Sequence, residues 1–184
     1  MKRNILVALA CICFVTTPAI SMAAPYVSAS VGASIAGEAK FDGRPHDLKE
    51  CAVFNGAVGY DLSLIRLELG IDYQSHPYVG RPEWGDLSFL TVSLNGYLDF
   101  DTGKGFAPYI MAGTGVTDVN TGDDYVNSTA FSLQAGAGVG IPLAKSITAD
   151  LGYRFLRPVN LKSIKAESVD WNSHNILAGL RFGF

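Results

Sequence analysis

The sequence is poor in cysteine, in basic residues and in long apolar runs, and each shortage excludes a class of protein. Three cysteines occur in 184 residues, and Cys11 and Cys13 lie close to the N-terminus. A domain left with Cys51 alone has no internal disulfide. The formal net charge is −3 at pH 7, so binding to nucleic acid, which needs a basic surface, is not expected. No apolar run reaches the roughly 20 residues of a transmembrane helix, so the chain could enter a membrane only as a closed β-barrel.

Residues 1–23 have the features of a secretory signal peptide. Lys2 and Arg3 supply positive charge, and the apolar run Ile5–Val15 that follows them is too short to span a bilayer. The segment Ser21–Ala23 then offers small residues at the two positions that a signal peptidase reads. We expect cleavage after residue 23, or one residue later, which leaves residues 24–184 as a single domain.

After residue 24 the apolar residues recur at every second position, which is the period of a β-strand. The clearest case is the segment 65–74, in which five apolar residues alternate with polar residues or glycine. Eight such segments are roughly 9–12 residues long, the length that a tilted membrane strand needs. The predicted strands are residues 26–37, 51–62, 65–74, 88–100, 106–116, 130–141, 147–155 and 174–184.

The connections between these segments alternate between long and short. The long ones are predicted loops at residues 38–50, 75–86, 117–128 and 156–171, and the short ones are turns at 63–64, 101–105 and 142–146. Outer-membrane barrels have short periplasmic turns, longer outside loops and an even number of strands. We therefore expect both termini to be periplasmic.

Alternation alone does not say whether the apolar faces point into a water-soluble barrel or out toward lipid. A water-soluble barrel covers its outside with charged side chains, mostly Lys and Glu. Lysine is absent from all eight predicted strands, and their second face is rich in Gly, Ser, Thr, Asn and Gln. The sequence thus predicts an all-β fold: an eight-stranded antiparallel up-and-down transmembrane β-barrel in a bacterial outer membrane.

A few charged residues fall on the inward faces of the predicted strands. Buried charge is costly unless it is paired, so we expect the acids and arginines to form ion pairs and hydrogen bonds that fill the lumen. The alternative is a thin water path lined by the same side chains. The residues are Asp61, Arg66, Glu68, Asp72, Asp99, Asp150, Arg154 and Arg181.

The last strand ends in the pattern Gly179-x-x-Phe182-x-Phe184. This pattern resembles the C-terminal signature of bacterial outer-membrane barrels, in which a glycine precedes two alternating aromatics and Phe is the last residue. The resemblance implies that the chain end acts as an insertion signal and that the barrel-assembly machinery is a partner during insertion.

The second half of the chain resembles a narrower group. A glycine-rich run at 134–140, the sequence Asp-Leu-Gly-Tyr-Arg within 147–155, His174 and the terminal strand look like the opacity-type surface antigens among the small outer-membrane barrels of the OmpA and OmpX type. That resemblance implies loops exposed to the host or the environment, with some members acting as adhesins. The implied partners are outer-membrane lipid, lipopolysaccharide and a host-surface receptor.

No catalytic, cofactor or metal site is expected. His46, His76 and His174 are scattered without the spacing of metal ligands. Asp170, Ser173 and His174 lie close together and could suggest a lipid-modifying hydrolase at the barrel rim. Adjacent residues of a strand point to opposite faces, however, so this serine is badly placed to be activated by this histidine.

Three aromatic residues lie among polar residues in the predicted loops: Tyr78, Trp84 and Tyr125. They are candidate contacts for a partner, or they belong to an interfacial aromatic girdle. Three hypotheses for function follow from the sequence: a surface antigen, adhesin or envelope-interaction protein; a narrow porin-like channel; and a lipid-modifying enzyme at the rim.

Overall fold

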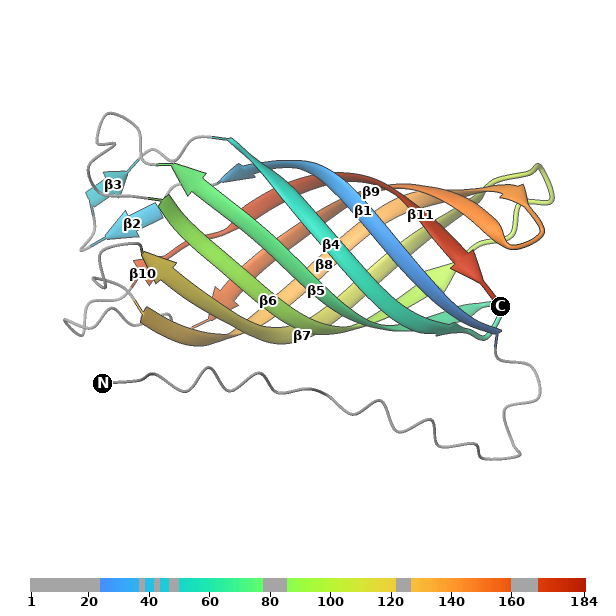
Figure 1. The fold of residues 1–184 in the computed structure, drawn as a ribbon, viewed down its shortest axis with the longest axis horizontal. Coiled ribbons are helices and arrows are strands. Elements are labelled where there is room, and N and C mark those ends of the chain that lie inside the picture. Colours follow the sequence, from blue (N-terminus) through green and yellow to red (C-terminus); the bar gives the residue numbers. More distant parts are fainter. Residues whose placement is uncertain are drawn as a thin grey trace.

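The computed structural model describes residues 24–36, 39–41, 44–46, 50–77, 86–121, 127–159 and 169–184. The predicted signal peptide lies outside these ranges, as do the loop aromatics Tyr78, Trp84 and Tyr125. The predicted eight-stranded antiparallel barrel is confirmed (Figure 1). Its strands are β1 (Ala24–Ala36), β4 (Cys51–Asp61), β5 (Ile65–Pro77), β6 (Asp86–Asp99), β7 (Ala107–Thr121), β8 (Asn127–Ala144), β9 (Ile147–Val159) and β11 (Ser173–Gly183).

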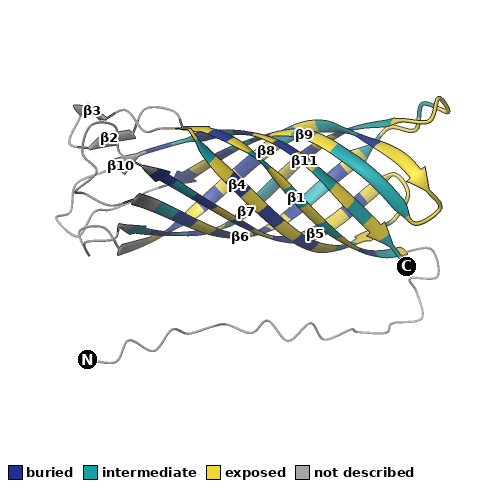
Figure 2. Cartoon of the chain, turned by 45° about the horizontal axis from the view of Figure 1, so that its top comes forward, coloured by how far each residue is buried: buried dark blue, intermediate teal, exposed yellow. Residues whose placement is uncertain are grey.

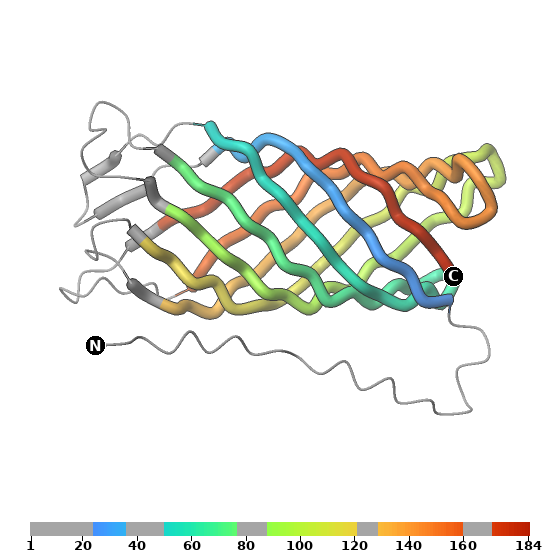
Figure 3. Tube along the Cα trace, viewed as in Figure 1, coloured from blue at the N-terminus to red at the C-terminus, as the bar shows by residue number. Residues whose placement is uncertain are grey.

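The barrel closes where the first strand meets the last. Going around it, the strands follow the order β1, β11, β9, β8, β7, β6, β5, β4, so each pairs with its neighbours in the chain and β1 pairs with β11. Tyr26 lies opposite Gly183 at one end of that seam, and Ala36 lies opposite Ser173 at the other. Figure 3 shows β1 in blue and β11 in red running side by side. The start of β1 and the chain end at Phe184 therefore lie at the end of the barrel that carries the short turns.

Two of the predicted loops contain short strands, which corrects the sequence interpretation. Residues 38–50 include β2 (Ala39–Phe41) and β3 (Arg44–His46), and residues 156–171 include β10 (Val169–Asp170). These three strands form a separate sheet in the order β10, β2, β3 at the loop-bearing end (Figure 1). A strand of two or three residues is too short to show a period, so the pattern gives no signal for it. β10 also pairs with β2, which lies far away in the sequence.

Several barrel strands are longer than predicted, so the predicted loops 75–86 and 117–128 are shorter than expected. β7 continues to Thr121 and β8 begins at Asn127, while β8 also extends past a bulge at Pro142/Ala144 on the turn side. The outward residues at the loop-bearing end become polar, although backbone pairing continues. The Ser75 and Ser88 hydroxyls lie 3.2 Å apart, and the Thr129 hydroxyl donates to Asp118 Oδ1 at 3.1 Å. Apolar alternation thus marks the lipid-facing part of a strand rather than its full length.

The barrel is apolar outside and polar inside. Leu94, Ile71 and Ile176 are 58%, 52% and 54% exposed, whereas Arg66 and Gln74 are 2% and 1% exposed. Exposed and buried residues alternate along the strands (Figure 2). This arrangement confirms the prediction that the apolar faces point outward, as they do in barrels that span a bilayer. Within the described part of the chain, no helix is long and apolar enough to cross a membrane.

Candidate functional site

The lumen is the candidate site because the charged residues singled out in the sequence converge there. At the turn end, Arg66 and Asp99 form a two-pronged ion pair. Arg66 Nε lies 2.5 Å from Asp99 Oδ2, and Arg66 Nη2 lies 2.9 Å from Asp99 Oδ1. The guanidinium also lies over the rings of Tyr97 and Tyr109, at 4.2 and 5.1 Å from their centroids. Stacking on aromatic faces and a forked contact with a carboxylate are both typical of arginine rather than lysine.

Glu68 occupies the middle of the lumen and is held by tyrosines rather than by a direct ion pair. The Tyr97 hydroxyl donates to Glu68 Oε1 at 2.7 Å, and the Tyr26 hydroxyl donates to Glu68 Oε2 at 3.0 Å. Both hydrogen bonds have a carboxylate as the acceptor. Such charge-assisted hydrogen bonds are roughly twice as strong as neutral ones. Tyrosine was not expected to anchor the interior charges, yet the rings of Tyr26 on β1 and Tyr97 on β6 both reach Glu68 on β5.

Glycine residues on other strands make room for tyrosine rings in the lumen. A Cβ atom at Gly59 would lie 2.6 Å from Cζ of Tyr26, and one at Gly152 would lie 2.5 Å from the Tyr109 hydroxyl. Both separations are shorter than van der Waals contact. The glycine-rich inward faces seen in the sequence are therefore partly explained by close approach of large aromatic side chains.

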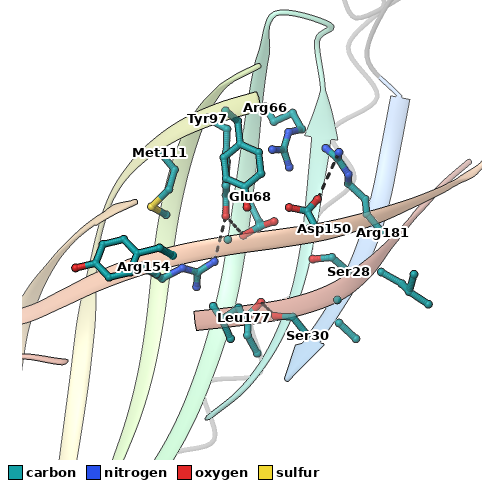
Figure 4. A pocket seen from close by; sticks show the side chains of 17 residues that line it. Ser28, Ser30, Arg66, Glu68, Tyr97, Met111, Asp150, Arg154, Leu177 and Arg181 are labelled. Carbon is teal, nitrogen blue, oxygen red and sulfur yellow. Dashed lines mark hydrogen bonds and ion pairs between the residues drawn. The ribbon is translucent and has the colours of Figure 1, made fainter. Parts of the chain in front are cut away.

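A second ion pair joins β5 to β9 across the barrel. Arg154 Nη1 donates to Asp72 Oδ1 at 2.9 Å, and Asn55 Nδ2 donates to the same oxygen at 2.9 Å. Arg154 Nη2 also donates to the Tyr97 hydroxyl at 3.3 Å, so this pair is linked to Glu68 through Tyr97. Figure 4 shows Arg154, Tyr97 and Glu68 meeting in the lumen.

Three charged candidates remain: Asp150 on β9, Arg181 on β11 and Asp61 at the end of β4. Arg181 Nη2 lies 3.5 Å from Asp150 Oδ2, so β11 and β9 are also joined by an ion pair. Asp61 does not join the network. Its Oδ1 instead accepts a 2.8 Å hydrogen bond from the backbone N–H of Ser63, which has a positive φ of 77° in the tight β4–β5 turn. Asp61 thus stabilises a turn at the rim.

A small cavity lies among these charged groups. It has a volume of about 50 Å³ and is bordered by Ser28, Ser30, Asp150 and Arg181 together with the Arg66–Glu68–Arg154 cluster (Figure 4). A cavity needs roughly 10–15 Å³ to hold one water molecule. The space suits a few water molecules, which could bond groups such as Arg181 Nη1, a buried atom without a protein partner.

Toward the loop-bearing end the lumen becomes first neutral and then richer in large apolar side chains. Thr91, Thr117 and Ser132 form a chain of hydroxyl contacts in the neutral layer. Above them lies a group of buried side chains that we call the outer cap. Its rings are packed closely: Phe89 and Trp171 stack with centroids 3.8 Å apart. The members of the outer cap are Val53, His76, Phe89, Val119, Ala130, Leu156 and Trp171.

The sequence interpretation missed the outer cap because it treated the inward faces as uniformly small and polar. The alternation along the strands did contain a signal. Phe89 precedes the outward-facing Leu90, and Leu156 follows the outward-facing Phe155, so Phe89 and Leu156 must point inward. Trp171 offered no such signal because it precedes β11 and belongs to no strand.

The residues proposed for a rim hydrolase do not face one another. Ser173 is fully buried inside the barrel, while His174 points outward and its Nδ1 lies 2.6 Å from the Tyr153 hydroxyl. His174 also packs against Phe155, with ring centroids 5.2 Å apart. In the described ranges no group of three or more His, Cys, Asp or Glu is placed to bind a metal ion.

Comparison with known proteins agrees with this geometry. A family model described as the outer membrane protein beta-barrel domain matches residues 5–182. Among curated proteins, the Rickettsia conorii protein named "Putative adhesin RC1281" is 25% identical over 174 residues, covering 74% of this chain and 70% of that protein.

Solved structures share the fold at low sequence identity. Neisserial surface protein A is 20% identical with a TM-score of 0.67, covering 87% of this chain and 97% of that one. The N-terminal β-barrel domain of Pseudomonas aeruginosa OprF is 16% identical with a TM-score of 0.54, again covering 87% and 97%.

Proposed function

Because the chain belongs to the outer membrane protein β-barrel family, we propose that it acts at the cell surface as an adhesin or envelope-interaction protein. In this proposal the barrel is a rigid, non-catalytic support. Binding is performed by the connections that follow β1, β5, β7 and β9, at the end where β2, β3 and β10 form their small sheet. The proposal also makes that end extracellular, with the short turns and both termini in the periplasm, as is usual for such barrels.

The observation that carries the proposal is the filled lumen. A channel for solutes needs a continuous polar passage, whereas the cavity found among the charged groups of the described residues has a volume of about 50 Å³. The outer cap then places apolar side chains across the next level, where Phe89 and Trp171 are 1% and 3% exposed. Eight strands leave an interior just wide enough for side chains. Because side chains occupy the interior, we expect a soluble partner to bind at the loop-bearing end rather than inside the barrel.

The name of the Rickettsia conorii relative, an adhesin, supports the same proposal. Loops commonly carry binding residues on a rigid scaffold, and aromatic residues are favoured as anchors in protein interfaces. Tyr78, Trp84 and Tyr125, which lie outside the described residues, are the side chains that we propose as contacts with a host-surface receptor. Lipopolysaccharide and outer-membrane lipid are proposed as the surrounding partners.

The test is a cell-adhesion assay with a non-adherent laboratory bacterium that displays the full chain. We expect displayed protein to increase attachment to host cells or matrix. A triple variant, Tyr78→Ser, Trp84→Ser and Tyr125→Ser, is expected to lose most of that increase. A matched control replaces the β6–β7 turn, residues 101–105, with another short turn and should adhere like the wild type.

Surface display is measured for each variant in parallel, by the heat-dependent mobility shift of folded barrels and by antibody labelling of intact cells. Equal adhesion of bacteria with and without the protein would contradict the proposed function. Loss of adhesion in the turn control at normal display would contradict the assignment of binding to the loop-bearing end.

A further inference from the structure

One positive charge points outward from the barrel wall near the loop-bearing end. Arg157 is exposed and lies two residues before the end of β9. Its neighbour Leu156 is buried in the outer cap, so the Arg157 side chain belongs to the outer face. Among the described residues that face outward from the eight barrel strands, Arg157 is the one arginine or lysine, and it has no ion pair with a described residue. An unpaired charge on the lipid face is costly at the bilayer centre and is tolerated near the interface.

A histidine lies beside this arginine on the neighbouring strand. His174 of β11 is directly opposite Phe155 of β9, and the two rings have centroids 5.2 Å apart. Arg157 is the next outward residue after Phe155, so it is a diagonal neighbour of His174 across the strand pair. Such neighbours have Cα atoms roughly 7–8 Å apart, which long side chains can bridge. Arg157 and His174 can therefore contact the same ligand on the outer wall.

The Tyr153 hydroxyl orients the histidine ring. Its oxygen lies 2.6 Å from His174 Nδ1. When this hydroxyl donates to Nδ1, the ring proton is on Nε2, and no described residue bonds that atom. The free groups of the pair are then an Nε2–H and a guanidinium, which both donate hydrogen bonds and do not accept them. The ligand that fits them is an acceptor, and the positive charge selects an anion.

The outward residues of β9 follow the order of chemical groups in a membrane lipid. From mid-strand toward the loop-bearing end they are Leu151, Tyr153, Phe155 and Arg157. An apolar residue that suits acyl chains is followed by two aromatic residues, which are typical of the membrane interface, and then by a positive charge. A lipid standing beside β9 would place its acyl chains, its interfacial part and its anionic group against matching side chains.

We propose that Arg157 and His174 bind a phosphate group of the phosphorylated glycolipid of the outer leaflet, the lipid A part of lipopolysaccharide. This inference rests on the proposed function in one respect, because it takes the loop-bearing end as extracellular. The guanidinium can contact two phosphate oxygens at once, and His174 Nε2–H donates to a third. The sugar of the glycolipid then packs its C–H groups on the rings of Tyr153 and Phe155, which a lipid with a glycerol headgroup does not offer.

The experiment counts the lipid bound to the purified barrel. The full chain is expressed in a bacterium, and the barrel is extracted from its membranes, washed free of lipid in a zwitterionic detergent and titrated with purified lipid A. Native mass spectrometry gives the number of lipids bound and their affinity. We expect one high-affinity lipid A per barrel, with an affinity that falls as salt is added, because exposed charges are screened.

Two further ligands identify the group that is recognised. Dephosphorylated lipid A keeps the sugars and acyl chains, and we expect it to bind roughly tenfold more weakly. Phosphatidylglycerol has a phosphate but no sugar, and it should also bind more weakly than lipid A. If the parent protein bound dephosphorylated lipid A as tightly as lipid A, the phosphate site would be wrong. Equal affinity for phosphatidylglycerol would overturn the choice of a glycolipid.

Three variants locate the site on the barrel wall. Arg157→Gln should weaken lipid A binding roughly tenfold, which is about 1.4 kcal/mol and close to the smallest contribution of a hydrogen bond to a charged group. His174→Phe keeps a ring, removes the Nε2 donor and should weaken binding severalfold. Lys145→Gln is the matched control, because it removes one positive charge from the exposed β8–β9 turn at the other end of the barrel. It should bind lipid A like the parent protein.

Unchanged lipid A binding in Arg157→Gln would overturn the proposal, and so would an equal loss in Lys145→Gln, which would indicate an effect of net charge. Each variant is first checked for the barrel's circular dichroism and heat-dependent mobility. The comparison of lipid A with its dephosphorylated form uses the parent protein, so it decides the proposal even where a variant does not fold. The measurement needs neither surface display nor host cells, so its failure and a failure of adhesion are separate results.

Discussion

Replacing Arg154 by alanine tests whether the lumen is held together by paired charges. Arg154 Nη1 donates to Asp72 Oδ1, and Asp72 is 5% exposed in the middle of the barrel. The variant leaves Asp72 with Asn55 as its side-chain donor, while its second oxygen already lacks a partner. Removing one member of a buried ion pair costs about 3–5 kcal/mol, because the other charge stays buried. We expect a loss of that size in the free energy of unfolding.

The corresponding change at Arg66 should cost less. Its partner Asp99 is the last residue of β6, next to the β6–β7 turn, and its side chain is 13% exposed compared with 7% for Asp72. Water can reach an abandoned Asp99 more easily, so we expect Arg66→Ala to cost about 1–3 kcal/mol, the range for an unsatisfied hydrogen-bonding group. Arg154→Ala should therefore lower the free energy of unfolding more than Arg66→Ala, because Asp72 is more deeply buried than Asp99.

The measurement is reversible urea unfolding in lipid vesicles, followed by tryptophan fluorescence, and it includes a double-mutant cycle. Arg154→Ala, Asp72→Ala and the double variant are compared with the parent chain. Direct contact predicts a coupling energy near the upper end of the usual 0.5–3 kcal/mol. Additive single effects, or an Arg154→Ala variant as stable as the parent, would refute the view that ion pairing fills and stabilises the lumen.

Three other changes and one control variant probe the two faces of the barrel and the chain end. Gly152→Ala should destabilise the barrel by about 1–3 kcal/mol through overpacking against Tyr109, while Gly56→Ala, with nothing within 4 Å of its new Cβ, should be neutral in the same unfolding assay. Leu94→Arg should cost about 2–4 kcal/mol in vesicles because Leu94 lies mid-strand on the lipid face. Deleting Phe184, which is 79% exposed, should hardly change refolded stability but should reduce the amount of barrel inserted in cells.

The barrel was predictable because one property is repeated along every strand. Outward positions in the central part of each strand face the bilayer, so they are mostly apolar at period two, and Ile65 through Tyr73 show the rule without interruption. The same alternation predicted that the side chains of Arg66 and Arg154 point inward. The apolar pattern stops before the strands do, since Asp118 and Thr129 remain paired beyond its last residues.

Partners within the lumen could not be predicted, because they are chosen by the space that eight strands enclose. Asp61 lies directly opposite Arg66 in the β4–β5 pairing, which made it the simplest candidate for an ion pair. The structure pairs Arg66 with Asp99 of β6 instead, and Asp61 bonds its own turn. The tyrosine contacts could not be predicted for the same reason. Whether a tyrosine ring fits across the lumen depends on glycines in other strands.

The order of layers along the lumen gives the loop-bearing end a separate role from the turn end. The ion pairs lie nearer the short turns, where water can form hydrogen bonds with them. Removing them should lower the free energy of unfolding without changing adhesion. The outer cap, with the stacked rings of Phe89 and Trp171, lies between that layer and the end that carries the β2–β3–β10 sheet. A partner bound at that end could therefore be gained or lost without disturbing the ion pairs that stabilise the barrel. Adhesion should respond to changes at the loop-bearing end, and the free energy of unfolding should respond mainly to changes below the cap.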